Sequence, residues 1–257
     1  MRSEILINSF HTIVRKETRR IFRIWPQTLL PSVITQSLYF LIFGGFVGSR
    51  VGNMAGVPYM MFIVPGLVMM AVIQNSFMNV VSTFFTAKFM KSIEELMVSP
   101  TPPWIMLAGF CTGGIIRGSV TGALVLAVSL FFTRPPVVHP WAIALFLFLT
   151  AALFSLGGFL NGIYAKKWDD IGIFSSFVLT PLTYLGGVFY SVSSLPPFWQ
   201  SVSKLNPILY MVDGFRFGFF GVSGVPVLES AGLLLAGNIV LIIVNLRLLR
   251  SGKGMRT

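Results

Sequence analysis

The side chains that could carry out catalysis are few in this sequence of 257 residues, and they are scattered along it. His11 and His139 are the two histidines, and Cys111 is the one cysteine, which falls inside an apolar stretch. The Gly-Lys pair at 252 and 253 is followed by Gly254, whereas a phosphate-binding loop requires Ser or Thr at that position. The sequence therefore predicts no catalytic site, no metal site and no nucleotide site of its own.

Arg117 is a charged side chain deep within an apolar stretch. A central arginine costs about 2.5–3.5 kcal/mol to insert into a bilayer, so it needs a partner or water. Two interpretations remain open: Arg117 lines the route of an anionic or polar substrate, or it forms hydrogen bonds that hold helices together. Its candidate partners are backbone carbonyls, water, and the amides of Gln36, Gln74, Asn75, Asn79 and Asn161.

An acidic pair, Glu94 and Glu95, lies in the polar segment 87–104 between two apolar stretches. Four apolar residues recur there at helical spacing, the glutamates fall on other faces, and three prolines between 100 and 103 stop the pattern. The apolar set is Phe89, Ile93, Leu96 and Met97. The segment predicts a short amphipathic helix at a membrane surface, either available to a cytoplasmic partner or acting as a rigid connector without one.

Six long apolar stretches must position these residues. The chain is 54% hydrophobic and 11% charged, with a mean hydropathy of +0.81, which excludes the soluble classes. Backbone polar groups in lipid must bond within their own segment, so the stretches should be helices. The prediction is an all-α polytopic membrane protein with six transmembrane helices at 28–48, 59–86, 105–132, 140–164, 171–190 and 231–249.

The positive charges gather on one alternating set of connections. With six spans, fourteen of the 19 basic residues share the side that holds both termini, and Arg50, Arg134, Lys204 and Arg216 lie opposite. Positively charged connections stay in the cytoplasm, which places both termini there. The fourteen are Arg2, Arg15, Lys16, Arg19, Arg20, Arg23, Lys88, Lys91, Lys166, Lys167, Arg247, Arg250, Lys253 and Arg256.

The net charge of +11 fits anionic lipid headgroups better than nucleic acid, because it lies beside the ends of the apolar stretches. Residues 4–25 place an apolar stripe opposite a basic one at spacings near three and four, and Pro26 ends the pattern. The apolar stripe consists of Ile7, Phe10, Ile13, Val14, Ile21 and Phe22. This pattern predicts an amino-terminal helix within 1–27 that lies in the cytoplasmic interface. The alternative is a solvated, frayed tail.

The segment 191–230 is too apolar for an ordinary loop, yet prolines and glycines interrupt it. Broken backbone at membrane depth is tolerated only where protein or a water-filled cavity covers it. The segment therefore predicts short re-entrant helices near 195–205 and 207–220. A different pattern occupies the third apolar stretch, where small residues that let helices approach closely recur as Gly109-x-x-x-Gly113, Gly114-x-x-x-Gly118 and Gly118-x-x-x-Gly122.

The residues 195–221 read LPPFWQSVSKLNPILYMVDGFRFGFFG. The paired proline, the apolar run, Asn206-Pro207, and then Tyr210 and Arg216 resemble the carboxyl-terminal signature of permeases of type-2 ATP-binding-cassette (ABC) exporters. This family includes bacterial permeases for polysaccharide, nodulation-factor and drug export. The resemblance extends over nearly the whole chain, from the basic amino-terminal helix through six spans.

The resemblance implies a single permease domain over 1–257 in the bacterial inner membrane, acting as a homodimer. Two copies of a separate ABC ATPase would bind ATP and Mg²⁺, so this chain would be no enzyme and hold no cofactor. The segments 1–27 and 87–104 would contact the ATPase, with Glu94 and Glu95 as coupling residues. The stretch 191–221 would form an outer re-entrant gate in which Asn206, Pro207, Tyr210 and Arg216 carry structural weight.

Two functions of other kinds remain as alternatives. An ion-coupled carrier would usually place acidic residues inside spans, and the predicted spans contain none. A membrane scaffold that recruits cytoplasmic partners would leave Arg117 and the broken segment 191–230 unexplained. ATP-driven export is therefore the leading prediction, with membrane lipids, the ATPase and a second copy of the chain as partners and no nucleic acid.

Overall fold

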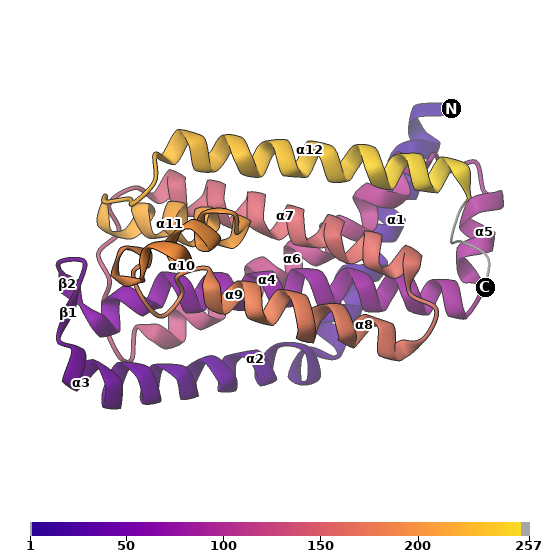
Figure 1. The fold of residues 1–257 in the computed structure, drawn as a ribbon. Helices are drawn as coiled ribbons and strands as arrows, with labels where there is room; N and C mark the ends of the chain where they lie inside the picture. The colour runs from indigo at the N-terminus through magenta and orange to yellow at the C-terminus, as the bar shows by residue number, and fades with distance from the viewer. Residues whose placement is uncertain (1, 253–257) are drawn as a thin grey trace.

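The computed structural model describes residues 2–252, apart from the side chains of Arg2, Ser3, Ile5 and Met97. Lys253 and Arg256, and the side chains of Arg2 and Met97, therefore lie outside the described part. The chain forms an elongated bundle of helices (Figure 1). Its elements are α1 (Arg2–Arg23), α2 (Trp25–Tyr39), η1 (Phe40–Val47), α3 (Gly48–Val51), β1 (Asn53–Met54), β2 (Val57–Pro58), α4 (Tyr59–Phe89), α5 (Ser92–Val98), α6 (Pro103–Ser129), α7 (Pro140–Tyr164), α8 (Trp168–Phe174), η2 (Ser175–Leu179), α9 (Thr180–Leu185), η3 (Val192–Ser194), α10 (Pro197–Lys204), α11 (Pro207–Phe220) and α12 (Val227–Ser251).

The described part confirms the all-α, polytopic membrane class. Five helical runs are long and apolar enough to cross a bilayer: Trp25–Val51, α4, α6, α7 and α12. The strands β1 and β2, each two residues long, form a small antiparallel hairpin before α4. The predicted spans at 28–48, 59–86, 105–132, 140–164 and 231–249 fall on these five runs, with ends that differ by a few residues.

The predicted fifth span, 171–190, differs from the structure. Its helix begins at Trp168, passes through the π-helical segment η2 and ends at Leu185. Gly187, two residues later, adopts a φ of +73° and turns the chain away. Asp169, Asp170 and several hydroxyl side chains reduce its hydropathy, and it is not among the five apolar runs. In Figure 1 it nevertheless lies along the long axis of the bundle beside α4 and α7.

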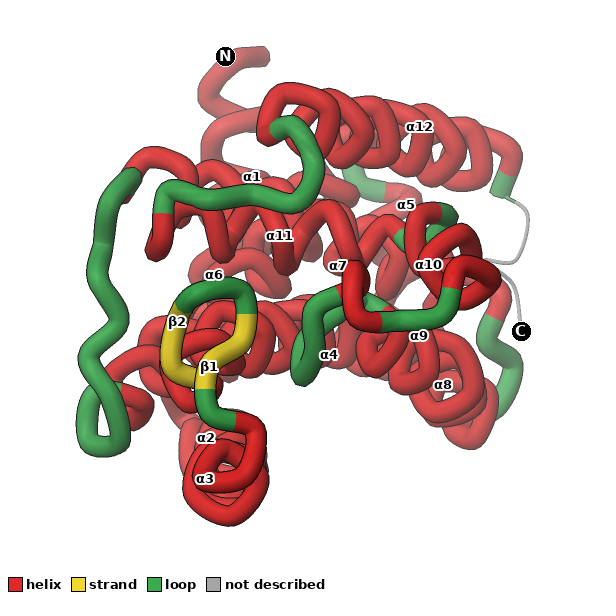
Figure 2. The backbone as a smooth tube through the Cα atoms, turned by 60° about the vertical axis from the view of Figure 1, so that its left-hand side comes forward, coloured by secondary structure: helices red, strands yellow, loops and turns green. Residues whose placement is uncertain are grey.

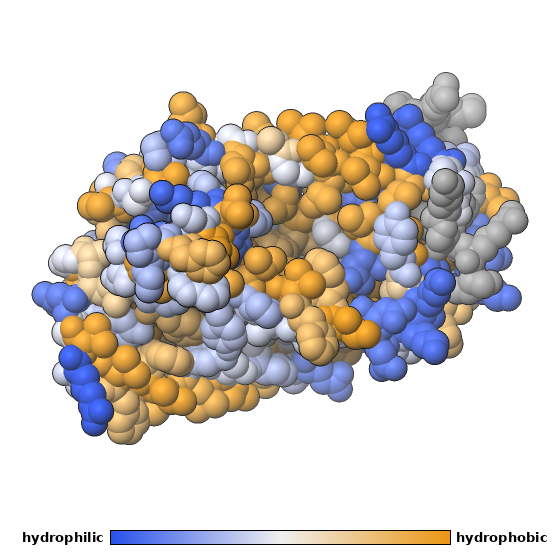
Figure 3. All heavy atoms as spheres, in the orientation of Figure 1, coloured by the Kyte–Doolittle hydropathy of each residue, from blue (hydrophilic) through white to orange (hydrophobic). Residues whose placement is uncertain are grey.

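The core lies along α4. Most of the α4 side chains are buried, because α6 and α7 pack on it along their lengths. Figures 1 and 2 show α4 and α7 inside the bundle, with α12 at one edge and the α2–α3 run at the opposite edge. Large apolar side chains on those two outer helices are exposed, including Leu38, Phe46, Leu235 and Val240. The space-filling view shows this apolar surface, with hydrophilic residues toward the two ends (Figure 3).

The predicted glycine pattern lies on α6 and serves three neighbours. A Cβ atom at Gly109 would lie 2.6 Å from Ile13 of α1, and a Cβ at Gly122 would lie 2.6 Å from Val72 of α4. A Cβ at Gly114 would lie 2.3 Å from Ser155 of α7. The small residues therefore let α6 approach α1, α4 and α7 at van der Waals distance, which is how helices hold together in lipid.

Candidate functional site

The acidic pair lies on α5, a seven-residue helix at one end of the bundle (Figure 1). Lys91 precedes α5 in the left-handed conformation, with a φ of +58°, and turns the chain sharply after α4. Ile93 is fully buried in a cluster with residues of α4, α6 and α7, whereas Glu94 and Glu95 are exposed. The helix is thus anchored by Ile93, with Leu96 packed against the same cluster, and presents two carboxylates outward.

A groove separates α5 from α1. It consists of two adjoining hollows of about 390 and 290 Å³, lined from both helices. Glu95 lines the smaller hollow together with Lys16 and Glu17 of α1, whereas Glu94 lines neither. A hydrogen bond from the Thr101 hydroxyl to Ser9 Oγ, 3.4 Å long, closes one end of the groove. The structure therefore gives the two glutamates different surroundings.

The buried face of α1 differs from the apolar stripe expected from sequence. Ile13, Glu17 and Ile21, spaced four residues apart, are nearly inaccessible, whereas Ile7 and Phe22 are exposed. A Cβ at Gly113 of α6 would lie 2.9 Å from the Glu17 side chain, which shows how closely the helices approach. Sequence reasoning missed Glu17, although the interval of four residues from Ile13 to Ile21 passes through it.

Glu17 belongs to a polar network that joins α1 to α4. The Arg20 guanidinium donates to Glu17 at 3.1 Å, to the Asn79 side chain at 2.8 Å and to the Thr83 hydroxyl at 2.5 Å. Burial raises the pKa of the Glu17 carboxyl, and the neighbouring Arg20 only partly opposes this. Lys88, another member of the predicted cytoplasmic set, is buried and donates to the carbonyls of Ile163 and Ala165.

Arg117 has a backbone partner. Its guanidinium donates to the carbonyl of Thr28 at 2.9 Å and so links the middle of α6 to the start of α2. This partner belongs to the carbonyl class named from sequence, and the amide side chains named with it receive no hydrogen bond from Arg117 in the described structure. Arg117 also takes no part in lining the groove between α1 and α5.

At the opposite end of the bundle, the segment 191–221 contains α10 and α11, close to the ranges expected for two short helices. Asn206 caps α11: its side chain accepts from the Ile208 N–H at 3.0 Å and donates to the Leu182 carbonyl at 2.6 Å. Pro207 begins the helix, and the Tyr210 hydroxyl donates to the Lys204 carbonyl at 2.8 Å. These three residues fix the angle between α10, α11 and α9.

Arg216 is buried in α11 and is not a surface charge. Its guanidinium donates to the Gly187 carbonyl at 2.9 Å and stacks over the ring of Phe62, 3.9 Å from the centroid. Asp213 lies 4.0 Å away and also accepts from the Val225 N–H at 2.9 Å. A buried arginine with an anion, a carbonyl and a ring as partners cross-links α4, α11 and the turn after α9.

The structure thus places six of the predicted site residues in two groups, one at each end of the bundle. Glu94 and Glu95 lie at the α1–α5 end, and Asn206, Pro207, Tyr210 and Arg216 lie at the far end (Figure 1). Arg117 lies between them. Within residues 2–252, no cluster of three or more His, Cys, Asp or Glu side chains could hold a metal ion.

Comparison with known proteins finds similar sequences over most of the chain. The family described as ABC-2 type transporter matches residues 8–220. The inner membrane transport permease YadH of Escherichia coli K12 is 54% identical over 247 residues, which is 96% of each chain. Nodulation protein J of Neorhizobium galegae is 24% identical over 212 residues, covering 79% of each chain. Nodulation protein J of Rhizobium leguminosarum bv. viciae is 22% identical over 243 residues, covering 90% of this chain and 92% of its own. From the apolar helical bundle and these matches, the chain belongs to the ABC-2 type transporter family.

Proposed function

We propose that this chain is the permease subunit of an ATP-driven exporter in a bacterial inner membrane. Two copies of the chain form the substrate path, and two copies of a separate ABC ATPase bind ATP with Mg²⁺ and supply the motion. Family membership and the similarity to YadH support the permease role and the membrane. The absence of a phosphate-binding loop from the sequence supports a partner that hydrolyses ATP.

The observation that carries the proposal is the α1–α5 end of the bundle. An ATPase can bias the permease only through contacts that differ between two states. Helix α5 offers two exposed carboxylates on an element anchored in the core by Ile93, and α1 is tied to α4 through Arg20. A push on either helix therefore reaches α4, the most buried helix of the bundle.

The distribution of charge supports the orientation within this proposal. Six crossings, with the α8–α9 run as the fifth, keep both termini and α5 in the cytoplasm, where most of the basic residues then lie. Helices α10 and α11 form the outer re-entrant gate, which Asn206, Pro207, Tyr210 and Arg216 stabilise. Arg117 lines the translocation path in one state of the transport cycle.

The first test is co-purification of the tagged permease with the proposed ABC ATPase. We expect the wild-type pair to purify together and to hydrolyse ATP in proteoliposomes. The double variant Glu94→Ala, Glu95→Ala should weaken retention of the ATPase about tenfold, which corresponds to roughly 1.4 kcal/mol. Stimulation of hydrolysis by the permease should be lost as well.

The matched control is Glu229→Ala, which removes an exposed carboxylate at the far end of the bundle. This variant should retain the ATPase like the wild type. The proposal is wrong if purified permease hydrolyses ATP unaided. The coupling role of α5 is wrong if the double variant retains and stimulates the ATPase fully.

A further inference from the structure

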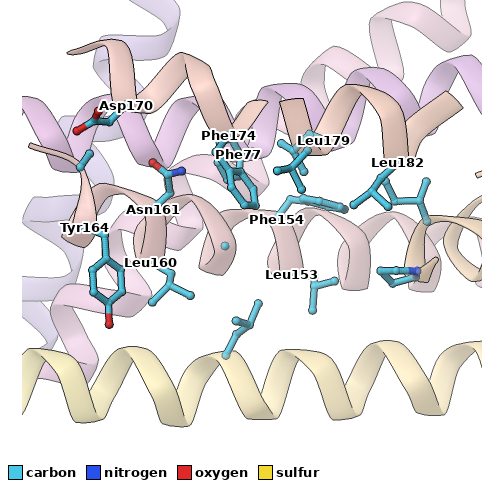
Figure 4. Close-up of a pocket in the computed structure, with 16 residues that line it drawn as sticks. Phe77, Leu153, Phe154, Leu160, Asn161, Tyr164, Asp170, Phe174, Leu179 and Leu182 are labelled. Atoms are coloured by element: carbon cyan, nitrogen blue, oxygen red, sulfur yellow. The ribbon is translucent and has the colours of Figure 1, made fainter. Parts of the chain in front are cut away.

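A cleft of about 510 Å³ opens between α7, the α8–α9 run and α12, and Pro207 of the far-end group lies in its lining (Figure 4). Most of its wall is hydrocarbon, supplied by side chains that include Leu153, Phe154, Phe174, Leu179, Leu182 and Leu241. Two of its walls, α7 and α12, are apolar enough to cross a membrane, so the cleft lies at the depth of lipid acyl chains.

One end of this cleft is polar. Asn161, Tyr164 and Asp170 line it there, where α7 ends and α8 begins. The Oδ1 atom of Asn161 is buried and has no hydrogen-bond partner, which leaves one acceptor in the wall without a donor. Asp170 accepts from the backbone N–H groups of Lys166 at 2.8 Å and Lys167 at 3.0 Å.

The charges at this end are of both signs. Asp170 lines the cleft, and the side chains of Lys166 and Lys167 are exposed just beyond it. A ligand that matches this end needs an N–H donor with positive charge for Asn161 and Asp170, and a negative group for the lysines. Joined to an apolar chain, these are the parts of a phospholipid whose headgroup carries a primary amine.

We propose that the cleft holds one such aminophospholipid from the cytoplasmic leaflet. Its acyl chain lies between Leu153 and Leu241, its ammonium group donates to Asn161 Oδ1 and Asp170, and its phosphate faces Lys166 and Lys167. The assignment of the lipid to this leaflet depends on the topology proposed above. Lipid binding itself does not depend on it, since binding requires neither the ATPase nor a transported substrate.

Gly157 provides the sharpest test of the acyl-chain site. It lines the cleft, and a Cβ atom there would meet nothing within 4 Å, so a side chain at this position begins in open space. The control is Gly232 of α12, which is equally open and does not line the cleft. Both variants carry leucine in place of a helical glycine, so their effects on helix propensity match.

The experiment titrates palmitoyl-oleoyl phosphatidylethanolamine into the full-length permease in detergent and counts bound lipid by native mass spectrometry. Gly157→Leu should bind about tenfold more weakly than wild type, which corresponds to roughly 1.4 kcal/mol, and Gly232→Leu should bind like wild type. Equal binding by wild type and both variants would overturn the site. Unchanged thermal unfolding of Gly157→Leu establishes that the variant is folded.

The headgroup is tested with phosphatidylcholine and phosphatidylglycerol of the same chains. Choline has no N–H donor, and glycerol adds no positive charge, so both lipids should bind more weakly than the ethanolamine lipid. Asn161→Leu removes the unpaired acceptor and should abolish the preference for ethanolamine over choline. Equal affinity for the three lipids in the wild type, or an unchanged preference in Asn161→Leu, would refute the headgroup assignment.

Discussion

Two buried carboxylates in this protein each have an arginine three positions later in the chain. Glu17 pairs with Arg20 at 3.1 Å, and Asp213 lies 4.0 Å from Arg216. The interval of three residues places both partners on one helix face. A buried ion pair requires further hydrogen bonds to repay desolvation, and here the bonds reach other elements, so each pair also fastens its helix to the bundle.

The Glu17 carboxyl should make the stability of the protein depend on pH. Burial raises its pKa in the folded state, so the folded protein binds a proton more readily than the unfolded chain. Stability from this group therefore increases as pH falls through the raised pKa and is complete below the unfolded value near 4.5. Glu17→Gln mimics the protonated form and should unfold at a higher temperature than wild type at pH 7.

That difference in unfolding temperature should shrink as the pH is lowered, and thermal unfolding of the detergent-solubilised protein measures it. Glu229→Gln serves as the control, because Glu229 is exposed and at the far end. Its difference from wild type should stay small at every pH. A Glu17→Gln variant that is less stable than wild type at pH 7 would contradict the raised pKa.

A substitution of Arg117 tests whether this residue lines the substrate path, a question that its hydrogen bond to Thr28 leaves open. Glutamine at 117 removes the charge and keeps an N–H donor on a side chain two atoms shorter than that of arginine. We expect Arg117→Gln to reduce export while the amount of protein in the membrane stays the same. Release of the exported compound from energised cells measures the effect, and Arg134→Gln, at an exposed loop position, is the control. Undiminished export would exclude the substrate role.

At the scale of elements, α6 acts as a spacer whose small residues set the distances between helices. A Cβ at Gly114 would lie 2.3 Å from Ser155, 2.5 Å from Val80 and 2.9 Å from the Ser76 carbonyl, so α4 and α7 close on this point together. Because dispersion contacts hold helices together in lipid, a shift here loosens two interfaces at once.

Gly114→Ala should therefore destabilise the bundle by about 1–3 kcal/mol, the usual cost of overpacking. Gly232→Ala, where a Cβ meets nothing within 4 Å, should be neutral or stabilise α12 by up to about 1 kcal/mol through helix propensity. Unfolding temperatures of the two purified variants decide the matter. If the two variants unfold at the same temperature, the close approach of the helices at Gly114 does not contribute to stability.

Two other elements share an irregularity. The α2–α3 run and the α8–α9 run each contain a π-helical segment, η1 and η2, in which the backbone is wound more loosely. The hydroxyls of Tyr39 and Tyr184 join the two runs at 3.2 Å. Segments of this kind are frequent at functional sites, and both runs pack less extensively on the core helix α4 than α6 and α7 do.

At the scale of the whole molecule, the described bundle has two dissimilar ends. The α1–α5 end carries the acidic pair and the basic helix α1, and the other end carries the β-hairpin, α10 and α11 (Figure 1). The proposed topology places these ends on opposite sides of the inner membrane. The orientation can be measured directly, because Cys111 is buried and is the one native cysteine.

Single cysteines in a Cys111→Ala background should separate the two ends. Cysteines at His11, Lys91 and Arg250 should react with a membrane-impermeant maleimide only after cells are permeabilised. Cysteines at the exposed positions Val137 and Val222 should react in intact cells. Reaction of the cysteines at 11, 91 and 250 in intact cells would contradict the six-span topology.

The sequence alone determined the helical membrane class, five of the spans, the short helices near 195–205 and 207–220, and the family resemblance. These features depend on hydropathy, on proline and glycine, and on local order, all of which are readable along the chain. The fifth helix was less readable, because Asp169, Asp170 and its hydroxyl residues dilute its hydropathy and Gly187 ends it early.

Only the tertiary structure decided which polar residues are buried and what they bind. Asn79 and Thr83, to which Arg20 donates, lie about sixty residues along the chain from it. Arg117 donates to a backbone carbonyl that carries no sequence signal. Whether Glu95 or Glu94 faces α1 also depends on how two distant helices pack. Such contacts are set by the approach of helices in space, which α6 controls through its glycines, and hydropathy along one helix does not encode them.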